Sequence, residues 1–212
     1  KRRPARNQPR GVERRSAIIA AAVRSFADHG YRGSSIADIA MECGISQAGL
    51  LYHFRSKAEL LEAVLEYRDD MSSDETNWAE RPGLDSLQAL REIVRSNMKA
   101  PGLARLFTVV TGEAVNPEHP AHLWASERYR FLRKSISDAL LHGIRTGEIR
   151  DTIVPQHIAE EVVAVMDGLQ IQWLVGGEQS AMSDAFDRYI DSLIGRIAAP
   201  ERSSTGPADA LS

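Results

Sequence analysis

The chain has few cysteines, no long apolar run and almost no strand-like alternation. Its 212 residues contain one cysteine, Cys43, which excludes an internal disulfide framework and most cysteine-ligated metal sites. No stretch approaches the roughly 18 uninterrupted apolar residues of a membrane span. The basic start, Lys1–Arg6, leads into polar sequence and not into the apolar core of a signal peptide. These absences predict a cytoplasmic protein with no membrane partner.

The common signatures of enzymes are also missing. The sequence contains no Walker A loop, no GxSxG and no GxGxxG that opens a βαβ unit. Cys43 falls in a turn between two short helical segments, where packing explains it better than nucleophilic chemistry. His119 and His122 lie three residues apart near Glu113, but Pro120 interrupts the pair and no fourth ligand is evident. We therefore expect no catalytic residue, no metal site and no cofactor.

Apolar residues recur at helical spacing along nearly the whole chain. Leu132, Ile136, Leu140 and Ile144 are four residues apart, and residues 186–197 alternate apolar steps of three and one. Glycine and proline mark the breaks between these segments. The pattern predicts an all-α protein with helices near residues 12–29, 35–42, 46–53, 56–77, 83–99, 102–115, 120–147, 155–175 and 181–198.

Charge is distributed unevenly along the chain. The 26 Lys and Arg against 29 Asp and Glu give a net charge of -3, which taken alone argues mildly against nucleic-acid binding. Residues 1–57, however, hold eleven basic and four acidic residues, whereas residues 58–212 hold fifteen and twenty-five. This asymmetry is typical of a nucleic-acid-binding segment joined to a different module. A basic tail that only aids solubility is the alternative.

Two short helices joined by a tight turn are predicted early in the chain. Ser35 can cap the first helix and Ser46 the second, because a serine hydroxyl accepts a hydrogen bond from a free amide of the first turn. Gly44 permits a left-handed turn between them. Leu50 and Phe54 are four residues apart and are predicted to face the core. This order of features predicts a helix-turn-helix, although a purely structural helical hairpin would need the same caps.

The outer face of the second short helix is small and polar. It carries Gln47, Ala48, Gly49 and Tyr52, with His53 at its end. Small residues let a helix approach DNA closely, and a glutamine can pair with the edge of adenine. The following helix opens with a capping box, Ser56-Lys-Ala-Glu59. Its free amides and Lys57 can together hold a backbone phosphate.

The stretch from Gly30 to Leu61, about the first quarter of the chain, resembles the TetR/AcrR family of transcriptional regulators. A weaker signature over residues 166–174 is similar to the C-terminal half of some members. The resemblance implies a homodimer that binds a palindromic operator and releases it when a small ligand enters the C-terminal domain.

The resemblance also assigns residues to the DNA contact. Ser35, Gln47, Tyr52, His53 and Lys57 fall at DNA-contacting positions of the family motif. Two positions depart from it. Leu51 stands where many members have a phosphate-contacting tyrosine, and Ala37 stands where some have a base-reading arginine. We expect Tyr52 either to replace the missing tyrosine contact or to leave it unmade.

The rest of the chain offers candidates for a ligand pocket and a dimer surface. Large apolar side chains of the middle helices can enclose a small apolar or aromatic effector, although such residues also form ordinary cores. The pocket candidates are Met98, Phe107, Trp124, Met166 and Trp173, with Glu113, His119 and His122 as polar groups that orient the ligand. Helix 155–175 is apolar on more than one face, so with helix 181–198 it is predicted to form a four-helix dimer interface. Packing of these faces within one subunit is the alternative.

These features predict a ligand-responsive regulator, by default a repressor, that binds double-stranded operator DNA as a homodimer. We expect a disordered basic arm over residues 1–11, a helix-turn-helix domain over 12–57, a ligand-binding and dimerisation domain over 58–199, and a disordered tail over 200–212. A helical ligand-binding or scaffold protein without specific DNA binding is the alternative. It would leave the basic arm and the polar helix face unexplained.

Overall fold

The computed structural model describes residues 8–73, 77–176 and 179–200. In these ranges the chain forms nine α-helices, one short 3₁₀ helix and a single isolated β-bridge, which confirms the prediction of an all-α fold. The helices are α1 (Gln8–Gly33), α2 (Ile36–Glu42), α3 (Gln47–His53), α4 (Lys57–Ser73), η1 (Trp78–Glu80), α5 (Gly83–Lys99), α6 (Pro101–Glu113), α7 (His122–Thr146), α8 (Pro155–Gly176) and α9 (Gln179–Ile197).

The helix ends differ from the sequence prediction at a few places. Helix α1 begins at Gln8, four residues early, because Pro9 lies in the first turn, where a missing amide hydrogen costs nothing. Residues 8–11, expected to be disordered, therefore belong to a helix. Helix α4 is described as far as Ser73, and residues 74–76 of the segment predicted to end near 77 lie outside the described residues. Helix α7 begins at His122, after a run of turns. The predicted disorder of residues 1–7 and 201–212 lies outside the described residues.

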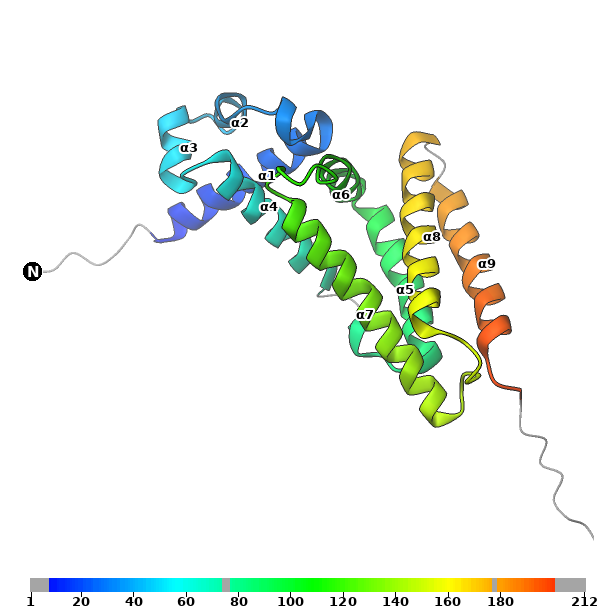
Figure 1. Ribbon diagram of the computed structural model, residues 1–212. Helices are drawn as coiled ribbons and strands as arrows, with labels where there is room; N and C mark the ends of the chain where they lie inside the picture. Colours follow the sequence, from blue (N-terminus) through cyan, green and yellow to red (C-terminus); the bar gives the residue numbers. More distant parts are fainter. Residues whose placement is uncertain (1–7, 74–76, 177–178, 201–212) are drawn as a thin grey trace, which may run out of the picture.

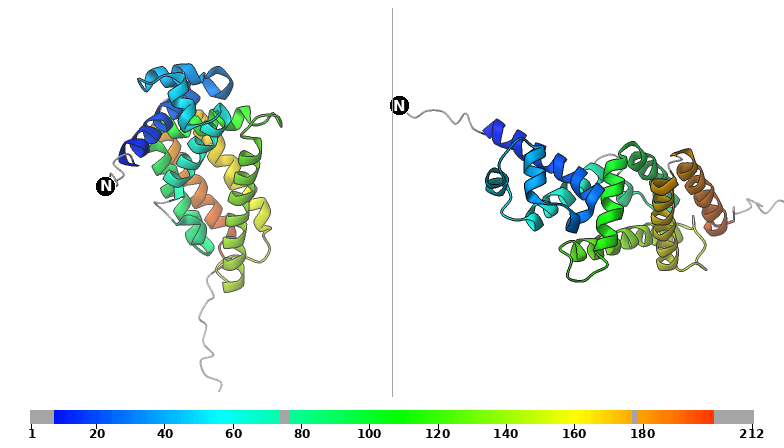
Figure 2. Two further views of the ribbon diagram at one scale, coloured as in Figure 1. Left: turned by 90° about the vertical axis from the view of Figure 1, so that its left-hand side faces the viewer. Right: turned by 90° about the horizontal axis from the view of Figure 1, so that it is seen from above.

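The first three helices and the last two helices lie at opposite ends of the molecule. Helices α1, α2 and α3 form one end of the molecule, α8 and α9 lie at the other, and α4 to α7 fill the space between them (Figures 1 and 2). None of the helices in the described part of the chain is long and apolar enough to span a bilayer.

Two hydrophobic cores hold this arrangement together. The first joins α1 to α4 with the second half of α6 and the start of α7, and the second joins α5, α7, α8 and α9. Helix α6 contributes to both, since Ala104 is buried in the second core whereas Leu106 and Val110 are buried in the first. Apolar packing thus continues across the domain boundary predicted at residue 57.

Candidate nucleic-acid interface and effector cavity

The helix-turn-helix is held by the predicted caps. Ser35 Oγ accepts a hydrogen bond of 3.1 Å from the Asp38 amide at the start of α2. Ser46 Oγ accepts one of 3.1 Å from the Gly49 amide at the start of α3. Gly44 has a φ of 65°, in the left-handed region that favours glycine. These local predictions are confirmed.

Helix α3 turns a polar face to solvent. Leu50 and Phe54 are fully buried in the first core, which fixes the rotation of the helix about its axis. Gln47 and Ala48 are exposed on the opposite side. The Tyr52 side chain is 86% exposed, far more than is usual for a tyrosine.

The remaining predicted DNA contacts are partly occupied within the protein. The His53 ring is half-buried and meets the Tyr52 ring edge-on, at 5.5 Å between centroids. The Ser35 hydroxyl, besides capping α2, donates to Asp38 Oδ2 at 2.6 Å. Gly49 has a packing reason of its own, because a Cβ there would lie 3.3 Å from the Oγ of the capping serine.

Lys57 does not point away from the protein. Its Nζ donates to the Ser34 carbonyl at 2.6 Å and lies 4.5 Å from the centroid of the Tyr31 ring. Burial lowers the pKa of Lys57, and the nearby Glu113 carboxylate opposes that change. Arg55, which the sequence reading missed, is exposed two residues earlier and forms no ion pair among the described residues. The sequence could have indicated this residue, because Arg55 is a basic residue that follows α3 by two positions.

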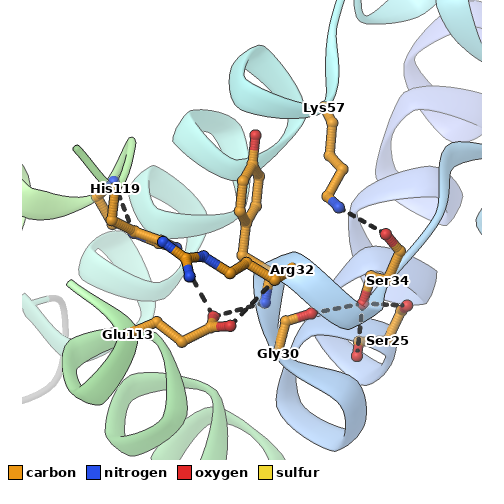
Figure 3. Close-up of polar contacts among 9 residues, drawn as sticks. Ser25, Gly30, Arg32, Ser34, Lys57, Glu113 and His119 are labelled. Carbon is orange, nitrogen blue, oxygen red and sulfur yellow. Dashed lines mark hydrogen bonds and ion pairs between the residues drawn. The ribbon is translucent and has the colours of Figure 1, made fainter. Parts of the chain in front are cut away.

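Glu113 at the end of α6 binds the broken end of α1 (Figure 3). Its carboxylate accepts hydrogen bonds from the Tyr31 amide at 2.6 Å and the Arg32 amide at 3.3 Å. These amides are free because Gly30, with a φ of 71°, interrupts the helix. A Cβ on Gly30 would lie 2.7 Å from Glu113 Oε1. We call these contacts the Glu113 hook.

Other polar groups surround the Glu113 hook. The buried Ser34 hydroxyl lies 2.8 Å from the Gly30 carbonyl, and Lys57 binds the Ser34 carbonyl from the start of α4 (Figure 3). His119 is buried, and its Nδ1 accepts a hydrogen bond of 3.1 Å from the Ala121 amide. Burial is the main cause that lowers the pKa of His119. The His119 ring meets the Tyr31 ring of α1 edge-on, at 5.1 Å between centroids. Glu113 and His119, predicted to orient a ligand, thus both contact the end of α1.

An internal cavity of about 50 Å³ lies among α4 to α9. Phe107 and Met166, two of the predicted pocket residues, line it. An outer recess of about 370 Å³ is lined by Trp124, also predicted, and by residues shared with the cavity, among them Trp78 and Arg128. Met98 and Trp173 pack in the second core and line neither space.

The walls of both spaces carry a group of charged residues that the sequence reading did not anticipate. Arg68 is 5% exposed, and its Nη1 lies 3.1 Å from Asp69 Oδ1. Arg128 Nη1 lies 2.7 Å from the same oxygen, and Trp124 Nε1 donates to Asp69 Oδ2 at 2.9 Å. Burial lowers the pKa of Arg68 to about 10, with the second guanidinium, that of Arg128, acting in the same direction. Both guanidiniums lie over the Phe107 ring, at 4.5 and 5.4 Å from its centroid.

A second carboxyl group completes this cluster. Asp167 on α8 accepts a hydrogen bond of 2.6 Å from the Tyr129 hydroxyl. Burial raises the pKa of Asp167, while this hydrogen bond and the two arginines lower it to a smaller extent. We call Arg68, Asp69, Arg128 and Asp167 the charged cluster.

Comparison with known proteins identifies the family. Residues 18–64 match the model for bacterial regulatory proteins of the tetR family, and residues 86–195 match the model for the C-terminal part of BetI-type transcriptional repressors. The second match alone covers more than half of the chain. The chain belongs to the TetR family. As a member of the TetR family, the protein is a ligand-responsive, DNA-binding transcriptional regulator and not an enzyme.

Individual relatives agree with this assignment. TtgR, a transcriptional regulator from Pseudomonas putida, is 23% identical over 194 residues, which cover 88% of this chain and 92% of TtgR. KstR2, a transcriptional repressor from Rhodococcus jostii, is 24% identical over 204 residues, with the same shares covered.

Solved structures share the fold. A TetR transcriptional regulator from Chloroflexus aurantiacus has a TM-score of 0.77 at 21% identity, covering 91% of this chain and 100% of that one. A regulator from Saccharomonospora viridis in complex with choline has a TM-score of 0.69 at 24% identity, covering 89% and 100%.

Proposed function

We propose that this protein is a repressor that binds a palindromic operator as a homodimer and releases it when a small effector enters the cavity. The observation that carries the proposal is the polar, exposed face of α3, which Leu50 and Phe54 hold outward from a capped helix-turn-helix. A single seven-residue helix offers few base contacts, so two copies on two half-sites are needed for specificity.

Selection from a random duplex library tests the DNA-binding part of the proposal. We expect the full chain to enrich a palindrome, with affinity that falls steeply as salt rises because phosphate contacts release counterions. Gln47→Ala should relax the preference at one base pair, whereas Arg55→Gln should weaken cognate and scrambled DNA alike. Enrichment of no motif would contradict the proposal.

Lys57 needs a separate test, because its ammonium is engaged within the protein. We propose that it acts on DNA mainly by positioning the start of α4 through the Ser34 carbonyl. Lys57→Met should therefore lower both thermal stability and operator affinity, whereas Arg55→Gln should lower affinity alone. A Lys57→Met variant with unchanged stability and a reduced salt dependence would instead identify Lys57 as a direct phosphate contact.

The outer face of α8 supports the proposed dimer. Ile171 and Val175 are 49% and 85% exposed there, on the same side as the small residues Ala164 and Gly168. A Cβ on Gly168 meets nothing within 4 Å in the chain itself. An apolar face with small residues suits close approach of the same helix from a second copy.

Gly168→Arg tests this surface without disturbing the fold of one subunit. We expect it to convert dimers to monomers in light scattering at micromolar concentration and to weaken operator binding. Gly102→Arg is the matched control, since a Cβ there also meets nothing within 4 Å but the residue belongs to α6 and not to the exposed face of α8. A wild-type monomer, or a dimer unaffected by Gly168→Arg, would remove support for this interface.

We propose that α6 couples the cavity to the DNA-binding end. Phe107 lines the cavity and Glu113 forms the hook, so a shift of one helix reaches both. Coupling is reciprocal, and operator DNA should therefore change the fluorescence of the tryptophans that line the recess. In Glu113→Ala the operator should still bind while this change is reduced. If operator DNA changes the fluorescence of Glu113→Ala as much as that of the wild type, the Glu113 hook does not couple the cavity to the DNA-binding end.

A further inference from the structure

We propose that the effector is an aromatic carboxylic acid whose carboxylate enters the inner cavity beside Arg68 and Arg128 while its ring occupies the outer recess. This inference rests on the proposed effector site and specifies its ligand chemistry. It follows from the sizes of the two spaces, from the partners of the charged cluster, and from the aromatic lining of the recess.

The two spaces differ in size. The inner cavity of about 50 Å³ has room for a group of a few atoms, because a water molecule takes up about 30 Å³ in the liquid. The outer recess of about 370 Å³ has the size of a small-ligand site. Trp78, Arg128 and Leu132 line both. A ligand with a small head and a larger body fits this pair of spaces.

The partners of the charged cluster favour a negative head. Asp69 accepts hydrogen bonds from Arg68, Arg128 and Trp124, so its acceptor capacity is largely used. Asp167 accepts a hydrogen bond from the Tyr129 hydroxyl, which uses part of its acceptor capacity. Arg128 Nε is buried and has no hydrogen-bond partner among the described residues. A buried donor without a partner is costly, and a carboxylate accepting from Arg128 would supply that partner.

The recess favours an aromatic body. Its walls include the rings of Trp78, Trp124 and Phe131, and the Trp78 and Phe131 rings meet edge-on at 6.2 Å. Such rings stabilise another ring through edge and face contacts. Asp69, Asp70 and Glu127 also line the recess. Asp69 is paired with the two arginines, and Glu127 with Arg130 at 3.5 Å. These acidic groups disfavour a carboxylate at the mouth and so orient the acid inward.

Three probes with one ring system test the head group. They are 2-naphthylacetate, 2-naphthylacetamide and (2-naphthylmethyl)trimethylammonium, titrated into the full chain by calorimetry. We expect the carboxylate to bind at least about tenfold more tightly than the amide, because hydrogen bonds from an arginine to a charged acceptor are among the strongest. Tighter binding of the trimethylammonium compound, equal binding of acid and amide, or no binding of the acid at millimolar concentration would each overturn the proposal.

Single substitutions test which residues bind the carboxylate of the ligand and which bind its ring. Arg128→Lys keeps the positive charge but loses Nε and the planar guanidinium with its paired donors. It should therefore bring the ratio of the affinity for the acid to the affinity for the amide towards one. Phe131→Ala, at a side chain 55% exposed, should weaken acid and amide equally without loss of the fold. Arg145→Gln is the matched control, because Arg145 is exposed in the last turn of α7 and lies outside both spaces, and it should leave the ratio unchanged. A ratio that falls equally in Arg145→Gln and Arg128→Lys would contradict the assignment to Arg128.

Operator release is measured separately, so that the two proposals can fail independently. If the acid binds as expected but operator DNA stays bound, the anion site stands and the proposed effector role fails. If the protein selects a palindrome but no acid binds, the proposed DNA-binding function stands and the inference about the effector fails.

Discussion

The DNA-binding end and the helical body depart from the usual placement of polar and apolar side chains in opposite ways. In the DNA-binding end, which comprises α1 to α3, Tyr52 is 86% exposed on α3. In the helical body, which comprises α4 to α9, Arg68 is buried on α4. Both placements are unfavourable for an isolated subunit in water. The difference is in what compensates each, since in our proposal the exposed ring is covered only when DNA binds, whereas the buried arginine is paired with Asp69 within the subunit.

The largest effect should come from the body. Asp69→Asn removes the negative charge shared by Arg68 and Arg128 and leaves two largely buried cations without that counter-ion. We expect the free energy of unfolding to fall by about 2–3 kcal/mol in urea titration. Asp138→Asn, which breaks the exposed pair with Lys134, should cost less than about 0.5 kcal/mol. Equal losses in the two variants would show that the cluster contributes no more than a surface ion pair.

The second-largest loss of stability should come from a substitution at Gly30, where the DNA-binding end meets the body. Gly30→Ala places a side chain on a left-handed residue and against the Glu113 carboxylate, and we expect a loss of about 1–2 kcal/mol. Gly44→Ala has the same backbone strain but no atom within 4 Å of the new Cβ, so it should cost less. Thermal unfolding compares the two. A larger loss at Gly44 would contradict the proposed crowding at Gly30.

At the DNA-binding end we expect a change of affinity and not of stability. Tyr52→Ala should leave the free energy of unfolding within about 0.5 kcal/mol and weaken operator binding about tenfold, the effect of losing about 1.4 kcal/mol of contact. Val115→Ala, at another exposed apolar residue, should change neither quantity. Loss of stability in Tyr52→Ala would mean that the ring serves the fold.

The smallest effect concerns pH. Because the pKa of His119 is lowered in the folded protein, the unfolded chain takes up its proton first as the pH falls. The stability contributed by neutral His119 is therefore complete above the ordinary histidine pKa of about 6.5 and is lost as the pH drops below it. We expect the melting temperature of His119→Gln to fall less than that of the wild type between about pH 7.5 and 5.5, a window that brackets that pKa. The exposed His142→Gln should retain the wild-type dependence.

The sequence predicted the DNA-binding end in detail because its determinants are local. The caps at Ser35 and Ser46 and the turn at Gly44 involve residues no more than a few positions apart, and the i, i+4 pair Leu50 and Phe54 sets which face of α3 is buried. Lys57 shows the limit of this reasoning, since its partner is the Ser34 carbonyl, 23 residues earlier.

The body was predicted as helices with an apolar pocket, but its charged cluster was not predicted. Arg68, Asp69 and Arg128 look like ordinary solvated positions in an amphipathic pattern. Only the contacts of the α4 side chains with α6 and α7 bring the two arginines to Asp69 and to the Phe107 ring. Helix periodicity identified Phe107, Trp124 and Met166 as pocket residues, but it could not separate them from Met98 and Trp173, which pack in the second core. The contact between α6 and α1 was missed for the same reason, because Glu113 and Tyr31 are 82 residues apart in the sequence.

The sharing of α6 between the two cores has a consequence for protein engineering. A fragment that ends with α4 would lack Leu106 and Val110, both buried in the first core, and would expose the apolar surface that they cover. Chimeric regulators that combine this DNA-binding end with another sensor should therefore keep the second half of α6 with its own N-terminal partner. A junction placed between residues 57 and 83 would separate side chains that depend on each other for burial.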